Sequence, residues 1–451
     1  MGLLGSLIQT NGAMRSVERS INAVQNNVAN ATTPGYAKVR HVPEADRFEP
    51  ADGVLGGVRP GDIVSYRNHF TDEAVRERTS AQSRFHQASS QLARIEPIVS
   101  VGDQGISGAI DRLFQSFSQL TVTPNDLNAR QITLDRARDV ARSFTQAAAT
   151  IESVRAGTDG ELRVSVEKVN ELAGRIAQLN AGKRANQNAG DPSGLDTAMS
   201  NALEELAGEV NFKALEQADG SVSVYVGGNQ LLAIGDRTFP IRLGAEGESR
   251  VVYDSGGNDI TSSLTGGKIA ATLEGYNQTL PSIEAELDRL AEGIGGEVNF
   301  ALQGGQDLDG ATPGAELFSF DATRGAARTL QVNELTPRQL AVATPGEPGS
   351  NGNAITLVDV GQRKQASGYT FGETLGILAG RIGREVQGAK DDASLAESLL
   401  TQAREQRQNE SGVSLDEEAA HLVQLQRAYQ ASAQLFRTIN EMTQDVIGML
   451  R

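Results

Sequence analysis

The feature that most constrains this chain is a narrow apolar stripe along each of its two ends. Near the N-terminus, apolar side chains recur at alternating spacings of three and four, with Thr10 as the only polar member. This is the spacing of a heptad repeat, whose stripe stays on one side of a helix and needs a partner helix to cover it. At 1.5 Å per residue the helix would be roughly 40 Å long. Its stripe consists of Leu3, Leu7, Thr10, Met14, Val17, Ile21, Val24, Val28 and Ala31.

The C-terminal end carries a matching stripe. Its helix has a clear start at Ser414, where Ser414 and Glu417 have the spacing of a capping box, and Asp416, Glu417 and Glu418 favour the positive end of the helix. The matching stripes predict that the two ends pair as an antiparallel coiled coil. Heptads alone leave open an intramolecular stalk, a homodimer or a polymer. The stripe consists of Leu422, Leu425, Tyr429, Ser432, Phe436, Ile439, Thr443, Val446 and Leu450.

The N-terminal stripe runs into residues 26–36, which we call the joint. Here the helix pattern meets Thr33-Pro34-Gly35-Tyr36. Proline has no N–H to donate, and Pro-Gly suits the central positions of a type II turn, so the helix must end and the chain must change direction. The polar side chains Asn26, Asn27 and Asn30 fit two uses, contact with neighbouring subunits or solvation of a polar helix face.

Between the two ends, helical and β patterns alternate. Helical periods cover 70–99, 106–120, 127–154, 162–179, a segment ending near 210, 268–302, and from 372 to the end. A short hairpin is predicted within 41–68 and strands within 222–252, and the Gly- and Pro-rich region 303–371 has 354–360 as its clearest strand.

These patterns predict a multi-domain fold, mainly α with β insertions. We expect a terminal coiled-coil inner domain from 1–38 and 412–451. A discontinuous helical-bundle domain would combine 39–210, 264–303 and 372–411, and a β-rich outer region would combine 211–263 and 304–371. At 451 residues the chain is long enough for several cores.

Composition argues against most kinds of chemistry. A net charge of −16 disfavours nucleic acid, the absence of cysteine excludes thiolate sites, and no cleavable signal or membrane-spanning run is present. His41, His69, His86 and His421 have no metal-site spacing, Gly266-Gly267-Lys268 lacks the rest of a phosphate loop, and Asp307-Leu308-Asp309-Gly310 lacks the other ligands of a calcium loop. The capping box accounts for Asp416, Glu417 and Glu418 without a catalytic acid pair. We therefore expect neither an enzyme nor a metal or cofactor site.

The joint, from Asn26 to Tyr36, resembles the N-terminal motif of bacterial flagellar axial proteins, the rod, hook and hook-associated families. The motif residues are Asn26, Asn27, Asn30, Thr33, Pro34, Gly35 and Tyr36. Residues 412–420 and 425–433 resemble the C-terminus of the hook-associated members, and internal blocks at 170–180, 227–232, 266–275, 287–299 and 304–310 are also similar to theirs. The resemblance therefore extends over most of the chain.

This resemblance implies a secreted structural protein of the flagellum, exported unfolded by the type III apparatus, that joins the hook to the filament and is needed for filament growth. The partners it implies are further copies in a helical tubular array, the hook protein, a second junction protein, the filament cap, and an export chaperone at the C-terminal region. Alternatives are another axial protein, such as a hook or rod component, and a secreted coiled-coil adhesin. We expect the unpartnered terminal stripes to be disordered or weakly helical before assembly.

Overall fold

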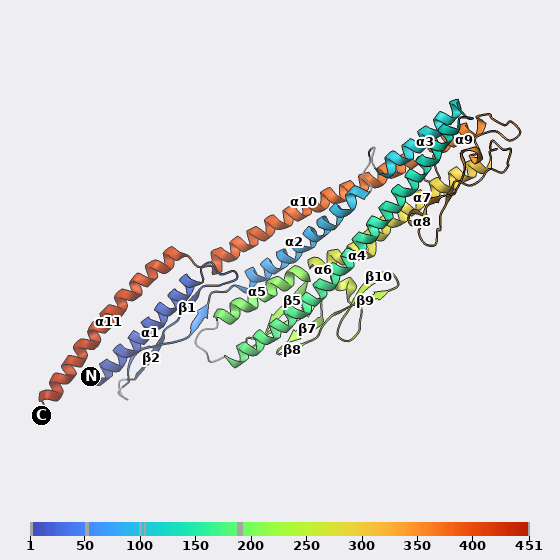
Figure 1. The fold of residues 1–451 in the computed structure, drawn as a ribbon. Helices are drawn as coiled ribbons and strands as arrows, with labels where there is room; N and C mark the ends of the chain where they lie inside the picture. Colours follow the sequence, from blue (N-terminus) through green and yellow to red (C-terminus); the bar gives the residue numbers. More distant parts are fainter. Residues whose placement is uncertain (1–2, 50–53, 99–101, 103–104, 187–192, 450–451) are drawn as a thin grey trace.

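The two ends of the chain lie side by side at one end of an elongated molecule. The computed structural model describes residues 3–49, 54–98, 102, 105–186 and 193–449. Helix α1 (Leu3–Ala29) runs towards the bundle and α11 (Leu415–Met449) runs back beside it, so both termini lie at the same tip (Figure 1). The predicted antiparallel pairing of the terminal helices is confirmed.

A small pair of β ladders packs on α1. Strands β1 (Val39–His41) and β4 (Ile63–Ser65) pair antiparallel, as do β2 (Glu44–Glu49) and β3 (Val54–Arg59), which confirms the predicted hairpin. Gly12 permits the close approach, because a Cβ there would lie 2.5 Å from the carbonyl oxygen of Val58. The two ladders therefore lie against α1, and α11 also packs against α1.

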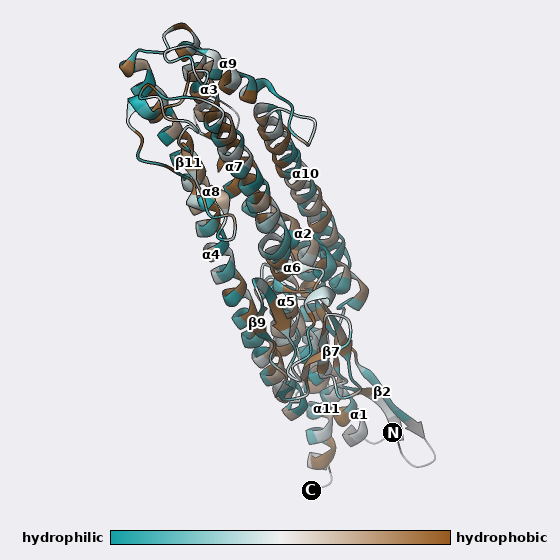
Figure 2. Cartoon of the chain, turned by 90° about the vertical axis from the view of Figure 1, so that its right-hand side faces the viewer, coloured by the Kyte–Doolittle hydropathy of each residue, from teal (hydrophilic) through white to brown (hydrophobic). Residues whose placement is uncertain are grey.

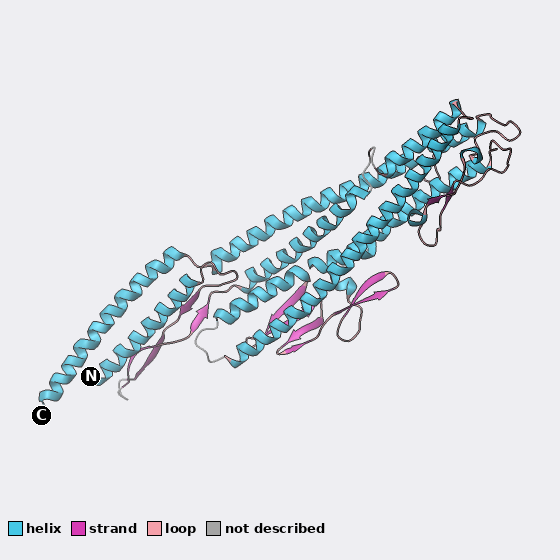
Figure 3. Ribbon diagram, viewed as in Figure 1, coloured by secondary structure: helices cyan, strands magenta, loops and turns pink. Residues whose placement is uncertain are grey.

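The rest of the helices form a long bundle that extends away from the terminal pair (Figure 3). Helix α2 packs along α10, and apolar residues from several helices form the buried cores of the bundle. Figure 2 shows hydrophobic and hydrophilic residues alternating along each helix. One core lies at the far end among α3, α4, α7, α9 and α10, and a second lies among α4, α5, α6 and a sheet. The helices are α2 (His69–Ile95), α3 (Ile106–Val122), α4 (Leu127–Ala185), α5 (Ser193–Glu209), α6 (Gly267–Glu274), α7 (Leu280–Gln303), α8 (Ala326–Thr329), α9 (Gly352–Gln362) and α10 (Phe371–Ser411).

The β insertions are small and antiparallel. A four-stranded sheet in the order β5-β6-β7-β8 covers α4 and α5, and β9 and β10 form a separate ladder. Residues 304–371 contain two short strands, helices α8 and α9, and a 3-10 helix at Pro337–Gln339. The strands are β5 (Phe212–Glu216), β6 (Val222–Val226), β7 (Gln230–Ile234), β8 (Arg237–Thr238), β9 (Arg242–Glu246), β10 (Ser249–Tyr253), β11 (Phe318–Ser319) and β12 (Gln331–Val332).

Helix-borne asparagines attach these extended segments to the bundle. Asn180 of α4 donates to the carbonyl oxygen of Val222 at 2.8 Å and accepts from its N–H at 2.7 Å. A side-chain amide has one donor and one acceptor side, so it can replace a neighbouring strand. The same two-way contact joins Asn170 to Ile241, Asn277 to Arg250 and Asn299 to Phe318.

The predicted break between 127–154 and 162–179 is wrong. Both segments belong to α4, a single helix of 59 residues. Gly157 and Gly160 lie inside it, and no atom would contact a Cβ at either position. The buried face continues through Thr158, whose hydroxyl donates to the carbonyl oxygen of Val154. Glycine raises the cost of a helix by only about 1 kcal/mol, which packing on both sides outweighs.

The predicted strand at 354–360 is also wrong, because this segment lies in helix α9. Ala354, Leu357 and Val360 are buried, whereas Ile355 is 49% exposed. This three-residue spacing of buried positions is helical, and a short apolar run does not by itself distinguish a strand from a buried helix. Packing against α3 and α7 selected the helix over the β preference of its Ile, Thr and Val residues.

Candidate functional site: the joint and the terminal helix pair

The joint turns as its sequence predicts. Helix α1 ends at Ala29, and the N–H of Tyr36 donates to the carbonyl oxygen of Thr33 at 3.2 Å around Pro34 and Gly35. Gly35 has φ +73°, the conformation that a type II turn requires at its third position. A side chain at Gly35 would collide with Asn201 of α5, whose amide donates to the carbonyl oxygen of Pro34 at 3.1 Å.

Asn27 joins three segments through a buried side chain that is 1% exposed. Its amide nitrogen donates to the carbonyl oxygen of Val39 at 2.9 Å and to Oε2 of Glu418 at 3.1 Å. Its oxygen accepts from the N–H of Val39 at 2.9 Å and from the Tyr36 hydroxyl at 3.0 Å. All four hydrogen-bonding positions of the amide are therefore occupied. Asn27 serves neither of the uses open from the sequence, since its contacts lie within the chain.

The side chain of Asn30, another asparagine of the joint, has a local role. The Asn30 amide donates to the carbonyl oxygen of Asn26 at 3.0 Å, and its oxygen accepts from the Thr33 hydroxyl at 3.2 Å. Asn26 and Asn30 are both half-buried. Both contacts of Asn30 stay within the end of α1 and the turn that follows it.

A second polar contact ties the start of α2 to the end of α10. The N–H of Lys38 donates to the carbonyl oxygen of Ser411 at 2.8 Å, and the Ser411 hydroxyl accepts from the N–H of Asn68 at 3.2 Å. Ser411 is buried. Chain segments at residues 27–39, 65–68 and 411–418 therefore meet at one place, where the terminal pair joins the bundle.

Charged side chains surround this meeting point. Arg67, which precedes α2, donates to Asp72 at 2.8 Å and to the carbonyl oxygen of Gly35 at 2.7 Å, so the segment that leads into α2 holds the turn of the joint. Arg407 of α10 pairs with Glu204 of α5 at 2.8 Å. Burial raises the pKa of Glu204, but Arg407 and Arg404 outweigh it, and the pKa lies below its usual range. The pair therefore stays charged at neutral pH.

The apolar stripe of α11 forms the face turned towards α1. Five of its large side chains are half-buried and Val446 is exposed; the half-buried residues are Leu422, Leu425, Tyr429, Phe436 and Ile439. On α1, Val24 is buried, Val28 is exposed, and Leu7, Met14, Val17 and Ile21 are half-buried. The Tyr429 hydroxyl donates to Glu18 at 3.2 Å. Leu3 lies in α1, but its side chain and the whole of Leu450 lie outside the described residues.

The start of α11 is capped less completely than its sequence predicts. The N–H of Glu417 lies 3.5 Å from the Ser414 hydroxyl, which is longer than the usual distance of about 2.7–3.2 Å for such hydrogen bonds. Glu418, which the sequence assigns only to the helix terminus, is 2% exposed and binds Asn27. Sequence spacing missed this contact, because the two residues are 391 positions apart.

His41, Asp307 and Asp309, which were considered above as possible metal ligands, have structural contacts. His41 is buried beside the Ser20 hydroxyl at 3.0 Å, and burial together with Arg19 lowers its pKa. Asp307 accepts from the N–H groups of Asp309 and Ala311 at 2.9 and 2.8 Å, and Asp309 pairs with Arg338. Within the described part of the chain, no group of three or more His, Asp or Glu side chains could hold a metal ion.

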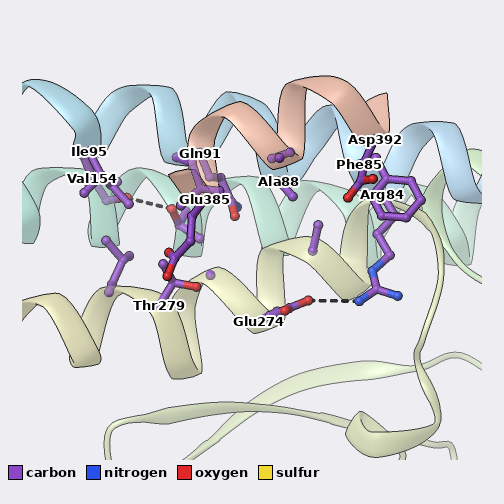
Figure 4. A pocket seen from close by; sticks show the side chains of 17 residues that line it. Arg84, Phe85, Ala88, Gln91, Ile95, Val154, Glu274, Thr279, Glu385 and Asp392 are labelled. Atoms are coloured by element: carbon purple, nitrogen blue, oxygen red, sulfur yellow. Dashed lines mark hydrogen bonds and ion pairs between the residues drawn. The ribbon is translucent and has the colours of Figure 1, made fainter. Parts of the chain in front are cut away.

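A cavity of about 350 Å³ lies within the bundle, between α2, α4, α10 and the π-helical turn Gly275–Thr279 that joins α6 to α7 (Figure 4). Gln91 reaches into it, and its buried amide nitrogen has no hydrogen-bond partner among the described residues. Arg84 and Glu274 close one side with a 3.1 Å ion pair.

Comparison with known proteins gives consistent matches. The family model for the flagellar hook-associated protein FlgK helical domain matches residues 92–318, and the model for the flagellar basal body rod FlgEFG protein C-terminal matches residues 404–449. Flagellar hook-associated protein 1 of Bacillus subtilis (strain 168) is 24% identical over 493 residues, covering 97% of this chain and 96% of its own.

More distant similarities agree. Flagellar hook-associated protein 1 of Salmonella typhimurium is 20% identical over 536 residues, covering 95% of this chain and 96% of its own. Among solved structures, the flagellar hook junction protein FlgK from Burkholderia pseudomallei matches with a TM-score of 0.66 and 15% identity, over 75% of this chain and all of that one. The structural match supports the multi-domain helical and β fold.

Proposed function

The chain belongs to the flagellar hook-associated protein FlgK family, and from this membership we propose that it is the structural subunit that joins the flagellar hook to the filament and is required for filament assembly. The observation that carries the proposal is the family match over half of the chain, together with a fold whose two ends meet in one helical pair. The proposed role is mechanical, because it depends on holding the terminal helices in a fixed orientation relative to the bundle.

We further propose that the terminal pair forms the inner layer of a helical tubular array of copies. The support is the surface that α1 leaves uncovered on α11, where Leu435, Met442, Val446 and Ile447 are each at least 45% exposed. Large apolar side chains gathered on one helix mark an interaction surface. A head-to-tail contact that does not close on itself produces such an array. In this arrangement the bundle and the β insertions lie progressively outward.

The partners follow from the same proposal. Membership of the flagellar axial proteins places this chain in the flagellum with hook components. More specifically, we propose contact with the hook protein, a second hook-associated junction protein and, during assembly, the filament cap. An export chaperone would bind the C-terminal region before type III export to the cell exterior. In the described part of the chain, no helix is long and apolar enough to cross a membrane.

A non-enzymatic role fits the family, which is structural. Among the alternatives, another axial protein has some support, because the model that matches residues 404–449 describes rod proteins. The helical-domain match and the full-length relatives favour the junction protein. A secreted adhesin would predict stable dimers in solution and filament growth that does not depend on this chain.

Deletion of the gene tests the function. We expect hooks without filaments and flagellin lost to the medium, with both defects reversed by the intact gene. Normal filaments in the deletion strain would refute the proposal.

Circular dichroism of the full chain and of residues 40–410 tests whether the terminal helices fold only on assembly. If the ends of the isolated protein already contribute full, cooperatively melting helix, the expectation that they are disordered or weakly helical before assembly is wrong.

A further inference from the structure

Two polar contacts hold strand β1 against α1 (Figure 1). Val39 exchanges two hydrogen bonds with the side chain of Asn27, and Nδ1 of His41 lies 3.0 Å from the hydroxyl oxygen of Ser20. Ser20 and Asn27 are about two turns apart and therefore lie on the same face of α1. A change at His41 thus acts on the strand that also holds the joint.

The hydrogen bonds around His41 determine where its ring carries a proton. The hydroxyl of Ser20 donates to the carbonyl oxygen of Ser16 at 3.1 Å, so its single proton is already used. Its oxygen therefore accepts from His41, which places the ring proton on Nδ1. Nε2 is then a lone pair, buried and without a hydrogen-bond partner among the described residues. The neutral ring in this tautomer is the form that the site accommodates.

A protonated ring would be poorly accommodated at this position. His41 is 8% exposed, so a charge there would lose most of its hydration. Protonation would also add an N–H at Nε2, where a buried donor without an acceptor costs free energy. Arg19 of α1 contributes a charge of the same sign. Burial and Arg19 together lower the pKa of His41.

The charged groups nearby do not compensate for these costs. In the described part of the chain, no Asp or Glu side chain forms an ion pair or hydrogen bond with His41. Strand β4 has no titratable side chain. Lys38 of β1 lies over the ring of Tyr66 instead. The other charged side chains of α1, of β1 and of the segments beside β4 are exposed, and they are Arg15, Glu18, Arg40, Glu44, Arg59 and Asp62.

From this geometry we propose that the contact between β1 and α1 is an acid-sensitive switch, in which protonation of His41 releases the strand and loosens the joint. A released ring binds a proton near its ordinary pKa of 6.5, whereas the packed ring has a lower pKa. The contact is therefore fully stable above pH 6.5 and weakens as pH falls from there towards the folded pKa. Since Val39 lies on the same strand, release also withdraws its two bonds from Asn27.

The size of the effect has an upper limit. If the packed ring stays neutral down to pH 5 and the released ring titrates at 6.5, release becomes up to about 25-fold more frequent at pH 5 than at pH 7. A two-stranded ladder without a packing partner is only marginally stable, so release also exposes the backbone N–H groups of the β1–β4 ladder to exchange.

NMR of the intact protein labelled with ¹⁵N-histidine tests the protonation state. The signals of His41 are identified by their loss in His41→Asn. We expect a proton on Nδ1 and none on Nε2 at pH 7, and a ring that stays neutral at pH values where the exposed His86 is charged. A proton on Nε2 at pH 7, or titration of His41 and His86 at the same pH, would overturn the proposal.

Hydrogen exchange measured by mass spectrometry tests the release, with rates corrected for the intrinsic effect of pH. Peptides of β1 and β4 should lose protection in the parent at pH 5 relative to pH 7. His41→Asn keeps a donor in place of Nδ1 but does not titrate, so it should remove most of this difference. His86→Asn is the matched control and should keep it.

Two results of this experiment would refute the switch. One is an equal loss of protection in the parent and in His41→Asn, and the other is a β1–β4 ladder that is already unprotected in the parent at pH 7. If His41→Asn is itself unprotected at pH 7, His41→Phe replaces it with the same expectation, because phenylalanine fills the space of the ring and does not titrate.

The consequence for the flagellum rests on the proposed function. We expect filament loss under shear to increase from pH 7 to pH 5 in cells with the parent protein, and to increase less with His41→Asn. Release of β1 in the isolated protein together with equal losses from the two strains would refute the joint as the part of the flagellum that acid weakens. Normal filaments in the deletion strain would refute the proposed function and leave the switch standing.

Discussion

Replacing Asn27 with leucine should loosen the joint more than any other single change of one of its asparagines. Leucine has a similar size, so it leaves no room for a substituting water, but it cannot bond to Val39, Tyr36 or Glu418. Val39 is 1% exposed, and both its N–H and its carbonyl would lose their partner. The buried Glu418 carboxylate would also lose its bond to Asn27. Each of these three groups costs about 1–3 kcal/mol when it is unsatisfied, so the local loss should be at least about 3 kcal/mol.

Hydrogen exchange measured by mass spectrometry gives the local readout, because the chain has more than one core and single two-state unfolding is not expected of such proteins. Peptides at the end of α1 and the start of α11 should exchange roughly 100-fold faster in Asn27→Leu, the factor that about 3 kcal/mol implies. Asn30→Leu is the matched control, since its bonds are local and partly exposed. Similar exchange rates in the two variants would refute the argument.

Asn27→Asp tests the contact with Glu418 separately. It would place a second carboxylate where the amide nitrogen lies 3.1 Å from Oε2 of Glu418. Like charges at this distance in a buried site repel strongly. Adding Glu418→Gln should recover part of the loss, because glutamine can donate to the new carboxylate. Effects of the two substitutions that simply add would show that the residues are not coupled.

Three further changes should have measurable effects. Gly12→Ala should separate β3 from α1, because its Cβ would lie 2.5 Å from the Val58 carbonyl oxygen, and should speed exchange in the hairpin. Glu204 has a folded pKa below its ordinary 4.5, so its contribution to stability is present above that pH and is lost as pH falls through the folded pKa. Between pH 7 and pH 3, urea unfolding should show a smaller loss of stability in Glu204→Gln than in the parent. Glu284 has the opposite sign, because burial raises its pKa against the effect of Arg155. Ionised Glu284 therefore lowers stability, and Glu284→Gln should raise the melting temperature at pH 7 by more than at pH 4.

The sequence predicted the parts of the fold that depend on local periodicity. The two apolar stripes predicted the terminal helix pair, and Pro34-Gly35 predicted where α1 ends. Local signals failed where packing decided the outcome, as in the uninterrupted α4 and the helical segment 354–360. The two glycines within α4 and the β-branched residues of 354–360 do not indicate which neighbouring elements will pack against each segment.

The joint was predictable as a turn but not as a buried polar centre. Nothing in the local pattern separates Asn27 from Asn26 or Asn30, because its partners lie on β1 and at the start of α11. The repeated use of helix-borne asparagines to hold extended segments, as at Asn180 and Val222, is equally invisible in the order of residues. A single sequence shows that such amides exist, and only the fold shows which backbone each one faces.

The distribution of buried residues along the terminal pair explains why the joint is the critical region. Among the described side chains of α1, the buried ones are Ser16, Ala23, Val24 and Asn27, and in the described part of α11 only Glu418 is buried. Stabilising contacts are thus concentrated near the joint, and the pair depends progressively more on other surfaces towards the termini. Helices with so little buried surface gain most of their stability from partners. A terminal pair that is firmly attached at one end and uncovered at the other can therefore dock on neighbouring copies while its direction from the bundle stays fixed.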